Sequence, residues 1–556
     1  MKIKTKKNDI ELIKQYKVEP LIANILINRG ISPEEANSLF NNPYSLLKNP
    51  NLLINGIEAA QAISNSINEE KEIWVYGDYD VDGITSGYSL VDFLKTVTNN
   101  DIFLYLPERT EGYGLDIEFC NKIIERRKEI DKDILIITVD NGVTRVEEVA
   151  YLKANNIDII ITDHHKPKEV LPDCIVVNPH IEQNDRYHHL CGCGVVFKLI
   201  QIMQQQLDKD YANKYYHVVA LATIADVMPL NLENLAIIKI GLEQLNSKDC
   251  PKSFAQFKKF LNKDVITPIE VSWDIAPRLN ACGRMGDIEL AANLLFFKDI
   301  GDIKSCLIDI EEINDKRKEL TKNAMKEIDK INFNNTHVCV YHDKDFPIGL
   351  TGPIANKISE TNNKPALVIT GSDELIGSAR SVGNINLQEL LESEMIKGHL
   401  SAFGGHEMAA GFSLKYDYLN NLTKSLEQLK LELPNNQNKL EEIIVDDEIQ
   451  LIDLNKGNYL AINSLAYTRD NTPLFIIKDL EVIKTHLSAN NTDNIELTVR
   501  DKNNNIKKIW AWRQGNNYYN MCSPKNISLI GEVKNDFMNK RNYTFDIKYI
   551  IGDDSK

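Results

Sequence analysis

Three short motifs in the first half of the chain hold the residue types of a divalent-metal site. GDYDVDG (77–83), VDNG (139–142) and DHH (163–165) together supply Asp78, Asp80, Asp82, Asp140, Asp163, His164 and His165. Carboxylates combined with one or two imidazoles suit cations such as Mg²⁺ and Mn²⁺. Two such ions, roughly 3.5–4 Å apart, can bind the attacking and the leaving oxygen of a phosphoryl transfer. The motifs therefore predict metal-assisted hydrolysis of a phosphate ester.

Each of these motifs lies at the end of an apolar run of strand length. The apolar runs are EIWVYG (72–77), DIFLYLP (101–107), DILIITVDNG (133–142) and DIIITDHH (158–165), and helical segments separate them. This alternation predicts an α/β domain built on a doubly wound parallel sheet. Ligands of such sheets bind beyond the carboxyl ends of the strands, so the acids and imidazoles should converge in one crevice. So many acids at one place require a compensating cation.

Other interpretations of these residues explain less. D-x-D-x-D-G also opens an EF-hand calcium loop, but here a strand precedes the loop and Ser89 stands where a bidentate Glu is needed. The acids could also be turn formers, an explanation that three successive strand ends argue against. Cys191 and Cys193 lack the spacing of a zinc site, and buried thiols in a reducing cytoplasm explain them better.

The net charge and the hydropathy pattern narrow the class of protein. A net charge of −16 argues against a protein that coats nucleic acid through its global charge. A local basic groove on an acidic body is still compatible with a nuclease. No stretch approaches the roughly 20 apolar residues that cross a bilayer, and MKIKTKKNDI lacks the apolar core of a signal peptide. We therefore expect a cytoplasmic protein that does not contact membranes.

The length and the pattern changes predict four segments. Residues 1–70 are expected to be helical, and residues 71–330 to form the α/β domain with a helical part and a connecting helix. Residues 331–434 are expected to form a smaller α/β domain with small-residue turns at GSARS (377–381) and FGGHEMAAG (403–411). LPNNQNK (433–439) is a polar linker, and the short strands expected in 440–556 suit a small barrel.

The motifs taken together resemble those of the DHH phosphoesterase family, and within it of the RecJ exonucleases. LATIADVMPL (221–230) resembles the family's fourth motif, and PERTEGYGL (107–115), APRLNACGRMGD (276–287), GSARS and FGGHEMAAG resemble RecJ segments in the same order. The match begins near residue 45 and continues almost to the end of the chain. It implies a DHH domain, a DHHA1 substrate-binding domain and an OB-like C-terminal domain.

The resemblance also implies a role for each motif residue. The metal ligands would be Asp80, Asp82, Asp140, His164 and Asp226, for two Mn²⁺ or Mg²⁺ ions. Asp78 and Asp163 would bind metal or hold a ligand in place. His165 would contact the scissile phosphate as a general acid or as a group that stabilises developing charge.

Further residues match family positions that bind the nucleic acid. They are Arg109, Ser378 and Arg380 at the DNA end, with Arg278, Asn280, Gly404, Gly405 and His406 as additional candidates. Arginine binds phosphate in a bidentate manner, and the GSARS turn would add backbone N–H donors. A structural ion pair is the alternative for each of the three arginines.

One departure and one ambiguity accompany this match. FPIGLTGPIANKI (346–358) keeps Gly349 but lacks the His that RecJ proteins usually carry there, so no role of that His transfers. In 440–556 the candidates for base stacking and backbone contact are Trp510, Trp512, Tyr518, Tyr519, Phe537, Tyr543, Lys507, Lys508, Lys534, Lys540 and Arg541. About half of these aromatic residues should belong to the barrel core.

The resemblance thus implies a single-strand-specific 5′→3′ DNA exonuclease that releases mononucleotides in repair and recombination. The polarity rests on the resemblance alone. A single-strand-binding protein and a helicase are conceivable partners. The alternatives are a DHH enzyme acting on oligoribonucleotides or phosphoadenosine phosphate, which lacks the OB-like block, and a non-catalytic DNA-binding relative, which would have lost ligands.

Overall fold

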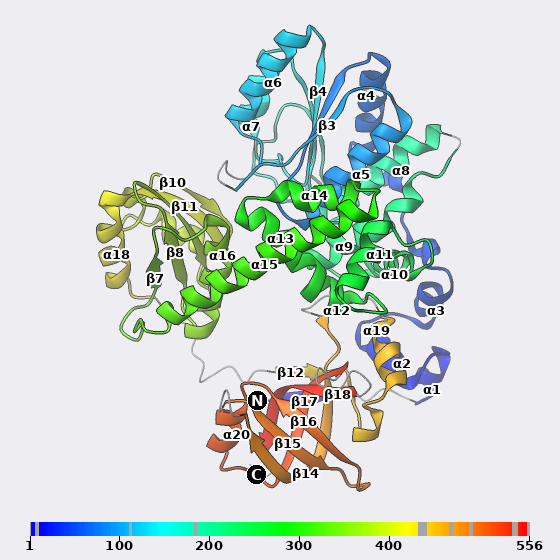
Figure 1. Cartoon of the computed structure of the whole chain (residues 1–556), viewed down its shortest axis with the longest axis vertical. Helices are drawn as coiled ribbons and strands as arrows, with labels where there is room; N and C mark the ends of the chain where they lie inside the picture. Colours follow the sequence, from blue (N-terminus) through cyan, green and yellow to red (C-terminus); the bar gives the residue numbers. More distant parts are fainter. Residues whose placement is uncertain are drawn as a thin grey trace.

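The computed structural model shows three bodies (Figure 1). It describes the chain except residues 1, 6–9, 110–113, 183–185, 208, 432–441, 466, 468–470, 489–492, 536–542 and 553–556. The predicted linker at 433–439 therefore lies outside the described residues, as do Phe537, Lys540 and Arg541. Among the helices described, none is both long enough and apolar enough to cross a membrane.

The first body contains the predicted parallel sheet. Its strands are β2 (Glu72–Tyr76), β3 (Ile102–Tyr105), β4 (Ile134–Val139), β5 (Asp158–Thr162) and β6 (Ile175–Val177), all parallel, in the order β3-β2-β4-β5-β6. The helices that cover it are α4 (Gly56–Asn68), α5 (Val81–Val97), α6 (Ile117–Ile130) and α7 (Val146–Ala154). Helix α5 contributes to one apolar core, and α6 and α7 to another, so the sheet is doubly wound as predicted.

A helical part follows the sheet. It comprises α8 (Gly192–Met203), α9 (Tyr216–Ala225), α10 (Leu232–Asn246), α11 (Lys252–Phe260), α12 (Pro268–Glu270), the π-helix η5 (Val271–Ile275), α13 (Ala276–Met285), α14 (Ile288–Phe296) and α15 (Ile300–Ile328). Helix α15 is 29 residues long and leads to the second body, which explains the highly charged sequence of this connecting helix (Figure 1).

The second body is the smaller α/β domain. Its strands β7 (Cys339–His342), β8 (Ala366–Thr370), β9 (Glu374–Arg380), β10 (Ala402–Gly405) and β11 (Ala409–Lys415) are ordered β10-β11-β9-β8-β7. Its helices are α16 (Ile348–Asn362), α17 (Leu387–Glu392) and α18 (Leu419–Gln428). The turn predicted at GSARS is wrong, because residues 377–380 belong to β9. That strand pairs with β8 and β11, so its backbone N–H groups are used by the sheet.

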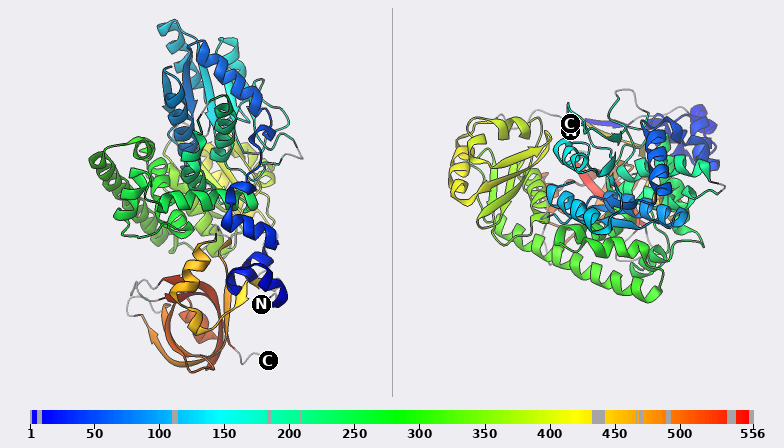
Figure 2. Two further views of the ribbon diagram at one scale, coloured as in Figure 1. Left: turned by 90° about the vertical axis from the view of Figure 1, so that its right-hand side faces the viewer. Right: turned by 90° about the horizontal axis from the view of Figure 1, so that it is seen from above.

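The third body is a barrel of antiparallel strands. The strands β14 (Phe475–Leu487), β15 (Ile495–Arg500), β16 (Ile506–Ala511), β17 (Asn526–Asn535) and β18 (Tyr543–Gly552) are ordered β16-β15-β14-β17-β18, and β16 contacts β18. The sheet therefore curls into the predicted OB-like shape (Figure 2, left). It also has β12 (Glu442–Val445), β13 (Asp447–Glu448), α19 (Lys456–Asn463) and α20 (Gly515–Asn520).

The N-terminal segment joins the first body to the third. Its helices α1 (Ile10–Gln15), α2 (Pro20–Asn28) and α3 (Pro33–Asn41) agree with the expectation, but β1 (Lys2–Thr5) pairs in parallel with β12. Asn24 Nδ2 donates to Asp447 Oδ2 at 2.6 Å, and Arg29 Nη2 donates to Asn471 O at 2.8 Å. Helix α3 contacts α10 instead. The start of the chain therefore lies against the barrel, which the sequence did not predict.

Candidate metal centre and its surroundings

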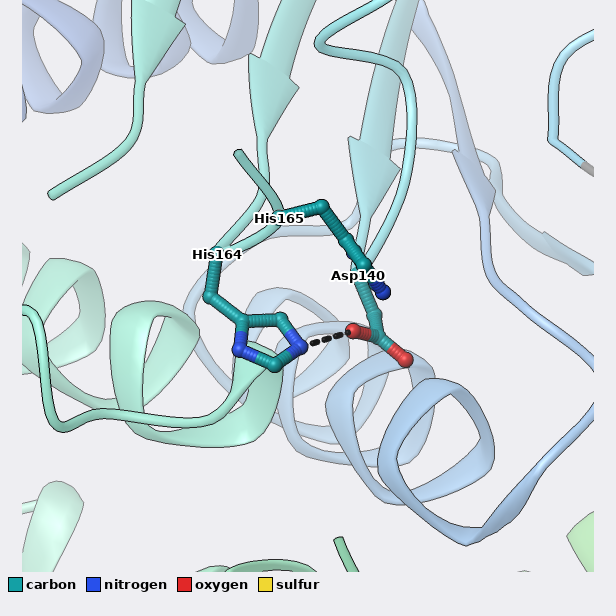
Figure 3. A group of neighbouring side chains, drawn as sticks. All are labelled: Asp140, His164 and His165. Atoms are coloured by element: carbon teal, nitrogen blue, oxygen red, sulfur yellow. Dashed lines mark ion pairs between the residues drawn. The ribbon is translucent and has the colours of Figure 1, made fainter. Parts of the chain in front are cut away.

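The acidic motifs converge at the carboxyl ends of β2, β4 and β5. Three sets of side chains each have their ligand atoms within 4.8 Å of one another: Asp78, Asp80 and Asp140; Asp82, His164 and Asp226; Asp140, His164 and His165. In Figure 3, His164 and Asp140 point toward each other from neighbouring strand ends. The six predicted metal ligands and His165 are thus one cluster, and Asp226 joins it from the end of α9.

His164 lies in the middle of this cluster. Its Nε2 atom is 3.1 Å from Asp140 Oδ1, the contact drawn in Figure 3. The same atom is 3.6 Å from Asp82 Oδ2 and 3.8 Å from Asp226 Oδ2. Burial lowers the pKa of His164, although Asp82 opposes this change. The ring is therefore neutral near pH 7, which is the protonation state that ligates a metal.

Local backbone structure holds the carboxylates in place. Asp80 caps α5, and its Oδ1 accepts hydrogen bonds from the backbone N–H groups of Asp82 and Gly83. The Asp82 carboxylate accepts from Gly192 N and Cys193 N at the start of α8, at 2.6 and 2.7 Å. Asp140 has a φ of 63°, a left-handed conformation that costs energy for a residue with a side chain. Such strain is typical of positions whose side-chain direction matters.

The donor set fits divalent cations. Asp78 Oδ1 is buried and has no hydrogen-bond partner among the described residues, and buried Asp140 Oδ1 faces only the His164 ring at 3.1 Å. Burial and the neighbouring carboxylates raise the pKa of Asp78 to about 8, and that of Asp140 well above its usual value. Buried carboxylates that repel one another and lack donors are stabilised by a cation, so the cluster can bind divalent metal ions.

Asp163 positions His165. One carboxylate oxygen of Asp163 accepts from the backbone N–H groups of His164 and His165 and lies 2.8 Å from His165 Nδ1, while the other accepts from Val143 N. Burial would lower the pKa of His165, but the Asp163 carboxylate raises it to about 9. The side chain of His165 is 39% exposed at the edge of the cluster. A protonated imidazole is thus available to a bound substrate.

Comparisons with known proteins agree with this geometry. Models of the DHH family N-terminal domain and of the DHHA1 domain match residues 72–223 and 335–432. The single-stranded-DNA-specific exonuclease RecJ of Haemophilus influenzae is 30% identical over 396 residues, which cover 66% of this chain and 68% of that protein. The chain belongs to the RecJ exonucleases of the DHH family.

Other relatives extend the likeness to the barrel. The Bacillus subtilis RecJ is 29% identical over 551 residues, covering 95% of this chain and 67% of its own length. A crystal structure of exonuclease RecJ bound to manganese is 29% identical with a TM-score of 0.61, and covers 69% of this chain and 94% of that one. The fold of Thermus thermophilus RecJ in complex with Mn²⁺ matches 99% of this chain and 79% of that one, at 23% identity and a TM-score of 0.81. The RecJ family members are hydrolases, and so is this chain.

A group of arginines adjoins the metal cluster of this RecJ-family protein. The Arg109 guanidinium lies 3.8 Å from the centre of the Tyr79 ring, and its Nε has no hydrogen-bond partner among the described residues. Arg284 Nη1 donates to Gly349 O, and Arg380 Nη1 donates to Ala379 O. Burial and the nearby Arg109 lower the pKa of Arg284 to about 10 and also lower that of Arg380. Arginines that repel one another in this way attract an anion.

Ser378 and Arg380 reach this region from β9. They are two positions apart in the strand, so their side chains lie on the same face of the sheet. Ser378 Oγ lies 2.8 Å from Thr351 Oγ1 of α16, and a Cβ at Gly352 would lie 3.0 Å from Arg380 Nη2. Both side chains therefore face the first turns of α16, where Arg284 contacts Gly349.

The remaining candidates for binding nucleic acid differ in whether other residues of the protein already contact them. Arg278 forms an ion pair with Glu311 of α15, at 2.5 and 3.0 Å, which agrees with the structural alternative. Asn280 Oδ1 accepts a hydrogen bond from Val81 N at 3.1 Å. It so supports the segment 77–83, here called the metal loop because it carries Asp78, Asp80 and Asp82. Gly404, Gly405 and His406 are exposed on the β10–β11 hairpin. Arg284 was not predicted as a binding residue from the sequence, although it lies in the APRLNACGRMGD motif (276–287).

Proposed function

We propose that this chain hydrolyses single-stranded DNA from the 5′ end and releases mononucleotides, with Mn²⁺ or Mg²⁺ as cofactor. The observation that carries the proposal is the buried acid and imidazole cluster beside Arg109, Arg284 and Arg380. The cluster suits two cations, and the arginines suit a phosphate group. Relatives whose names state single-stranded-DNA specificity support the substrate class.

The proposed ligands are Asp78, Asp80, Asp82, Asp140, His164 and Asp226. Bound cations would supply Lewis acidity and a nucleophilic water at neutral pH. His165, held by Asp163, would donate a proton to the leaving oxygen or stabilise the charge that develops on the scissile phosphate. Asp163 acts through His165 and is a positioning residue.

The proposed end-binding residues are Arg109, Ser378 and Arg380. Their side chains lie near α16 and the metal loop, so a terminal phosphate bound there would bring the adjacent phosphodiester to the cations. This arrangement supports an exonuclease, and the 5′→3′ direction follows the family resemblance. Gly404, Gly405 and His406 are proposed to contact the strand from the β10–β11 hairpin. Arg278 and Asn280 would assist only indirectly, because Glu311 and Val81 already engage them.

The wider assignment follows the predicted segments. We propose a catalytic domain over 71–330, a substrate-binding domain over 331–434 and a single-strand-binding domain over 440–556, with residues 1–70 as an accessory segment. A role in DNA repair and recombination in the cytoplasm, with a single-strand-binding protein and a helicase as partners, is consistent with this substrate. The barrel argues against an enzyme of short oligoribonucleotides, and the complete ligand set argues against a non-catalytic relative.

The test is digestion of end-labelled substrates. Single-stranded DNA, duplex DNA and short RNA are incubated with Mn²⁺, Mg²⁺ or EDTA, using 5′ and 3′ labels. We expect mononucleotides from the 5′ end of single strands only, and none in EDTA. Asp140→Asn and His164→Ala should abolish cleavage, whereas Asp133→Asn, which removes an exposed acid paired with Arg127, should not. Cleavage in EDTA at the Mn²⁺ rate would disprove the metal mechanism.

A further inference from the structure

Trp273 is the most exposed large aromatic side chain in the described part of the chain. It is 63% exposed and lies in the π-helix η5, between α12 and α13. The backbone N–H of Ala276 donates to Val271 O, five residues earlier, so this turn is wider than an α-helical one. π-Helical turns inside helices frequently mark functional sites. The family function described above does not account for this indole.

Trp273 begins a stripe along one side of the helix. Trp273, Pro277, Asn280 and Arg284 follow at intervals of four, three and four residues, which places them on one face. Of the residues between them, Ile275, Ala276 and Leu279 are buried, whereas Asp274 and Arg278 are half-buried. The helix therefore buries its apolar side. On the stripe Trp273 is exposed, whereas Asn280 and Arg284 are half-buried against Val81 and α16.

The far end of the stripe lies at the metal loop. Asn280 accepts from Val81 N, next to Asp80, and Arg284 contacts Gly349 O of α16. At a rise of about 1.5 Å per residue, Trp273 lies about 10 Å along the axis from Asn280. The indole is thus within a few nucleotides of the cations that the acidic cluster would hold.

The near end of the stripe lies toward the barrel. Glu270, the last residue of α12, is close enough to Tyr459 and Tyr467 beside the barrel to influence the pKa of both. Figure 1 shows α12 at the edge of the first body that faces the barrel, with α13 further up. A strand that runs from the barrel to the metal loop would therefore pass along this helix.

The chemistry of the stripe suits a single strand. It holds an indole, a proline, an amide and a guanidinium, and no carboxylate. The acid beside it, Asp274, faces Lys263 and Arg278, and Arg278 in turn faces Glu311 on α15. A phosphate backbone along the stripe thus meets no unpaired acid, and a base meets an open aromatic face.

We infer that Trp273 stacks on a base of the bound strand between the barrel and the metal loop. It would act as a binding residue that holds the incoming strand in register, several nucleotides from the end that is cut. This inference rests on the proposed function and adds a base contact outside the metal cluster and the end-binding arginines. Aromatic stacking is tolerant of sequence, because every base offers a π face.

The test compares Trp273→Ala, Trp273→Phe and the control Tyr416→Ala in the full-length protein. Tyr416 is 53% exposed in the short helix η7 (Tyr416–Tyr418), which follows β11 in the second body. Cleavage of oligonucleotides shorter and longer than the roughly 4–16 nucleotides that one OB-type fold covers gives KM and kcat as a function of length. Long substrates with a single abasic site, moved one position at a time from the 5′ end, locate the base that is stacked.

We expect Trp273→Ala to raise KM for long strands roughly tenfold, which corresponds to one stacked base, and Trp273→Phe to recover most of this loss. The difference should shrink as the substrate is shortened. One abasic position should weaken binding to the wild type and to Tyr416→Ala but not to Trp273→Ala. Equal KM values for all variants, or a loss that is the same at every length and abasic position, would overturn the inference. Failure of the wild type to cleave single strands would instead refute the proposed function.

Discussion

At the residue scale, the two histidines of the DHH motif differ in their surroundings. His164 is buried among three carboxylates, whereas His165 is partly exposed and hydrogen-bonded to Asp163. We predict that His165→Ala lowers kcat by about 10²–10⁴-fold while Mn²⁺ binding is retained, because a proton donor is lost and the carboxylate ligands remain. Turnover and the Mn²⁺ content measured by metal analysis check this prediction.

The contrary outcome has a structural basis, since His165 can also approach a cation together with Asp140 and His164. If His165→Ala lost Mn²⁺ but kept full activity for each bound pair of metal ions, His165 would be a metal ligand. Asp163→Asn serves as the matched comparison. It should affect kcat in the same direction but less than His165→Ala, because the amide oxygen can still accept a hydrogen bond from the imidazole.

The sequence predicted the acidic cluster because its members follow consecutive strands of a parallel sheet. The carboxyl ends of parallel strands lie at one edge of the sheet, which brings Asp78, Asp140 and His164 together. The sequence did not predict the ion pair between Arg278 and Glu311, because these residues are 33 positions apart on different helices. Arg284 was missed for the same reason: its distinguishing feature is burial beside Arg109, which depends on how α13 and α16 pack together.

At the element scale, α9 carries Asp226 at its C-terminal end and His217 in its first turn. His217 is only 5% exposed, and burial lowers its pKa to about 4. The unfolded chain binds a proton at its usual pKa of 6.5, whereas the folded protein does not. The contribution of His217 to the free energy of unfolding should therefore be fully present above pH 6.5. It should be lost as the pH decreases toward 4, which lowers the free energy of unfolding by up to about 3 kcal/mol.

Urea denaturation of the wild type and of His217→Gln between pH 7 and pH 4 measures this contribution. A glutamine has no proton to bind, so the unfolding free energy of the variant should change less over the interval. Identical pH profiles for the two proteins would show that His217 is not the group responsible.

The packing of α13 against α16 explains why Gly349 is kept in this segment, which lacks the family's His. A Cβ at Gly349 would lie 2.3 Å from Arg284 O, so any side chain would separate the two helices. We predict that Gly349→Ala destabilises the protein by about 1–3 kcal/mol and lowers activity, because Ser378 and Arg380 face α16. Thermal unfolding and cleavage assays measure both effects.

Gly398→Ala is the matched control for this substitution. Nothing lies within 4 Å of a Cβ at Gly398, and its φ is not in the left-handed region. Its stability and activity should therefore equal those of the wild type. If Gly349→Ala also had no effect, the contact between α13 and α16 would have to be loose enough to accept a methyl group.

Elements with strong local patterns were predicted, and those decided by partners were not. The four apolar runs became β2, β3, β4 and β5, because their composition and their flanking turns agree with a buried parallel sheet. GSARS was expected to be a turn because of its small residues. In the sheet those small residues allow close packing: a Cβ at Gly377 would lie 2.3 Å from the Phe412 ring on the neighbouring strand.

At the scale of the whole molecule, the barrel is tied to the start of the chain. β1 pairs with β12, and Asn28 Nδ2 donates to Asp446 O at 2.7 Å across 418 residues of sequence. Sequence patterns gave no sign of these contacts, because polar residues in short helices and edge strands have no period that identifies a distant partner. The barrel and residues 2–29 should therefore be removed or retained together.

The barrel is expected to contribute binding of the strand and not chemistry. The proposed metal ligands lie between residues 78 and 226, and the proposed end-binding residues Ser378 and Arg380 precede the barrel, so we expect chemistry and end binding not to need it. The barrel surface offers Trp512, which is 48% exposed and stacked on Trp510 at 5.2 Å. A chain of residues 31–434 should therefore still cut short single strands. It should bind long ones at least tenfold more weakly, because several base stacks of about 1–3 kcal/mol are lost.

The salt dependence of the affinity shows whether the barrel binds the DNA strand or only stabilises the protein. The affinity of the full-length protein for long strands should fall more steeply with salt than that of residues 31–434, because the barrel neutralises additional phosphates. Filter binding or fluorescence anisotropy across a salt series gives both slopes, and circular dichroism confirms that the shortened chain is folded. A folded 31–434 chain with the affinity and slope of the full-length protein would show that the barrel supports the N-terminal segment or binds a protein partner, and does not hold the strand.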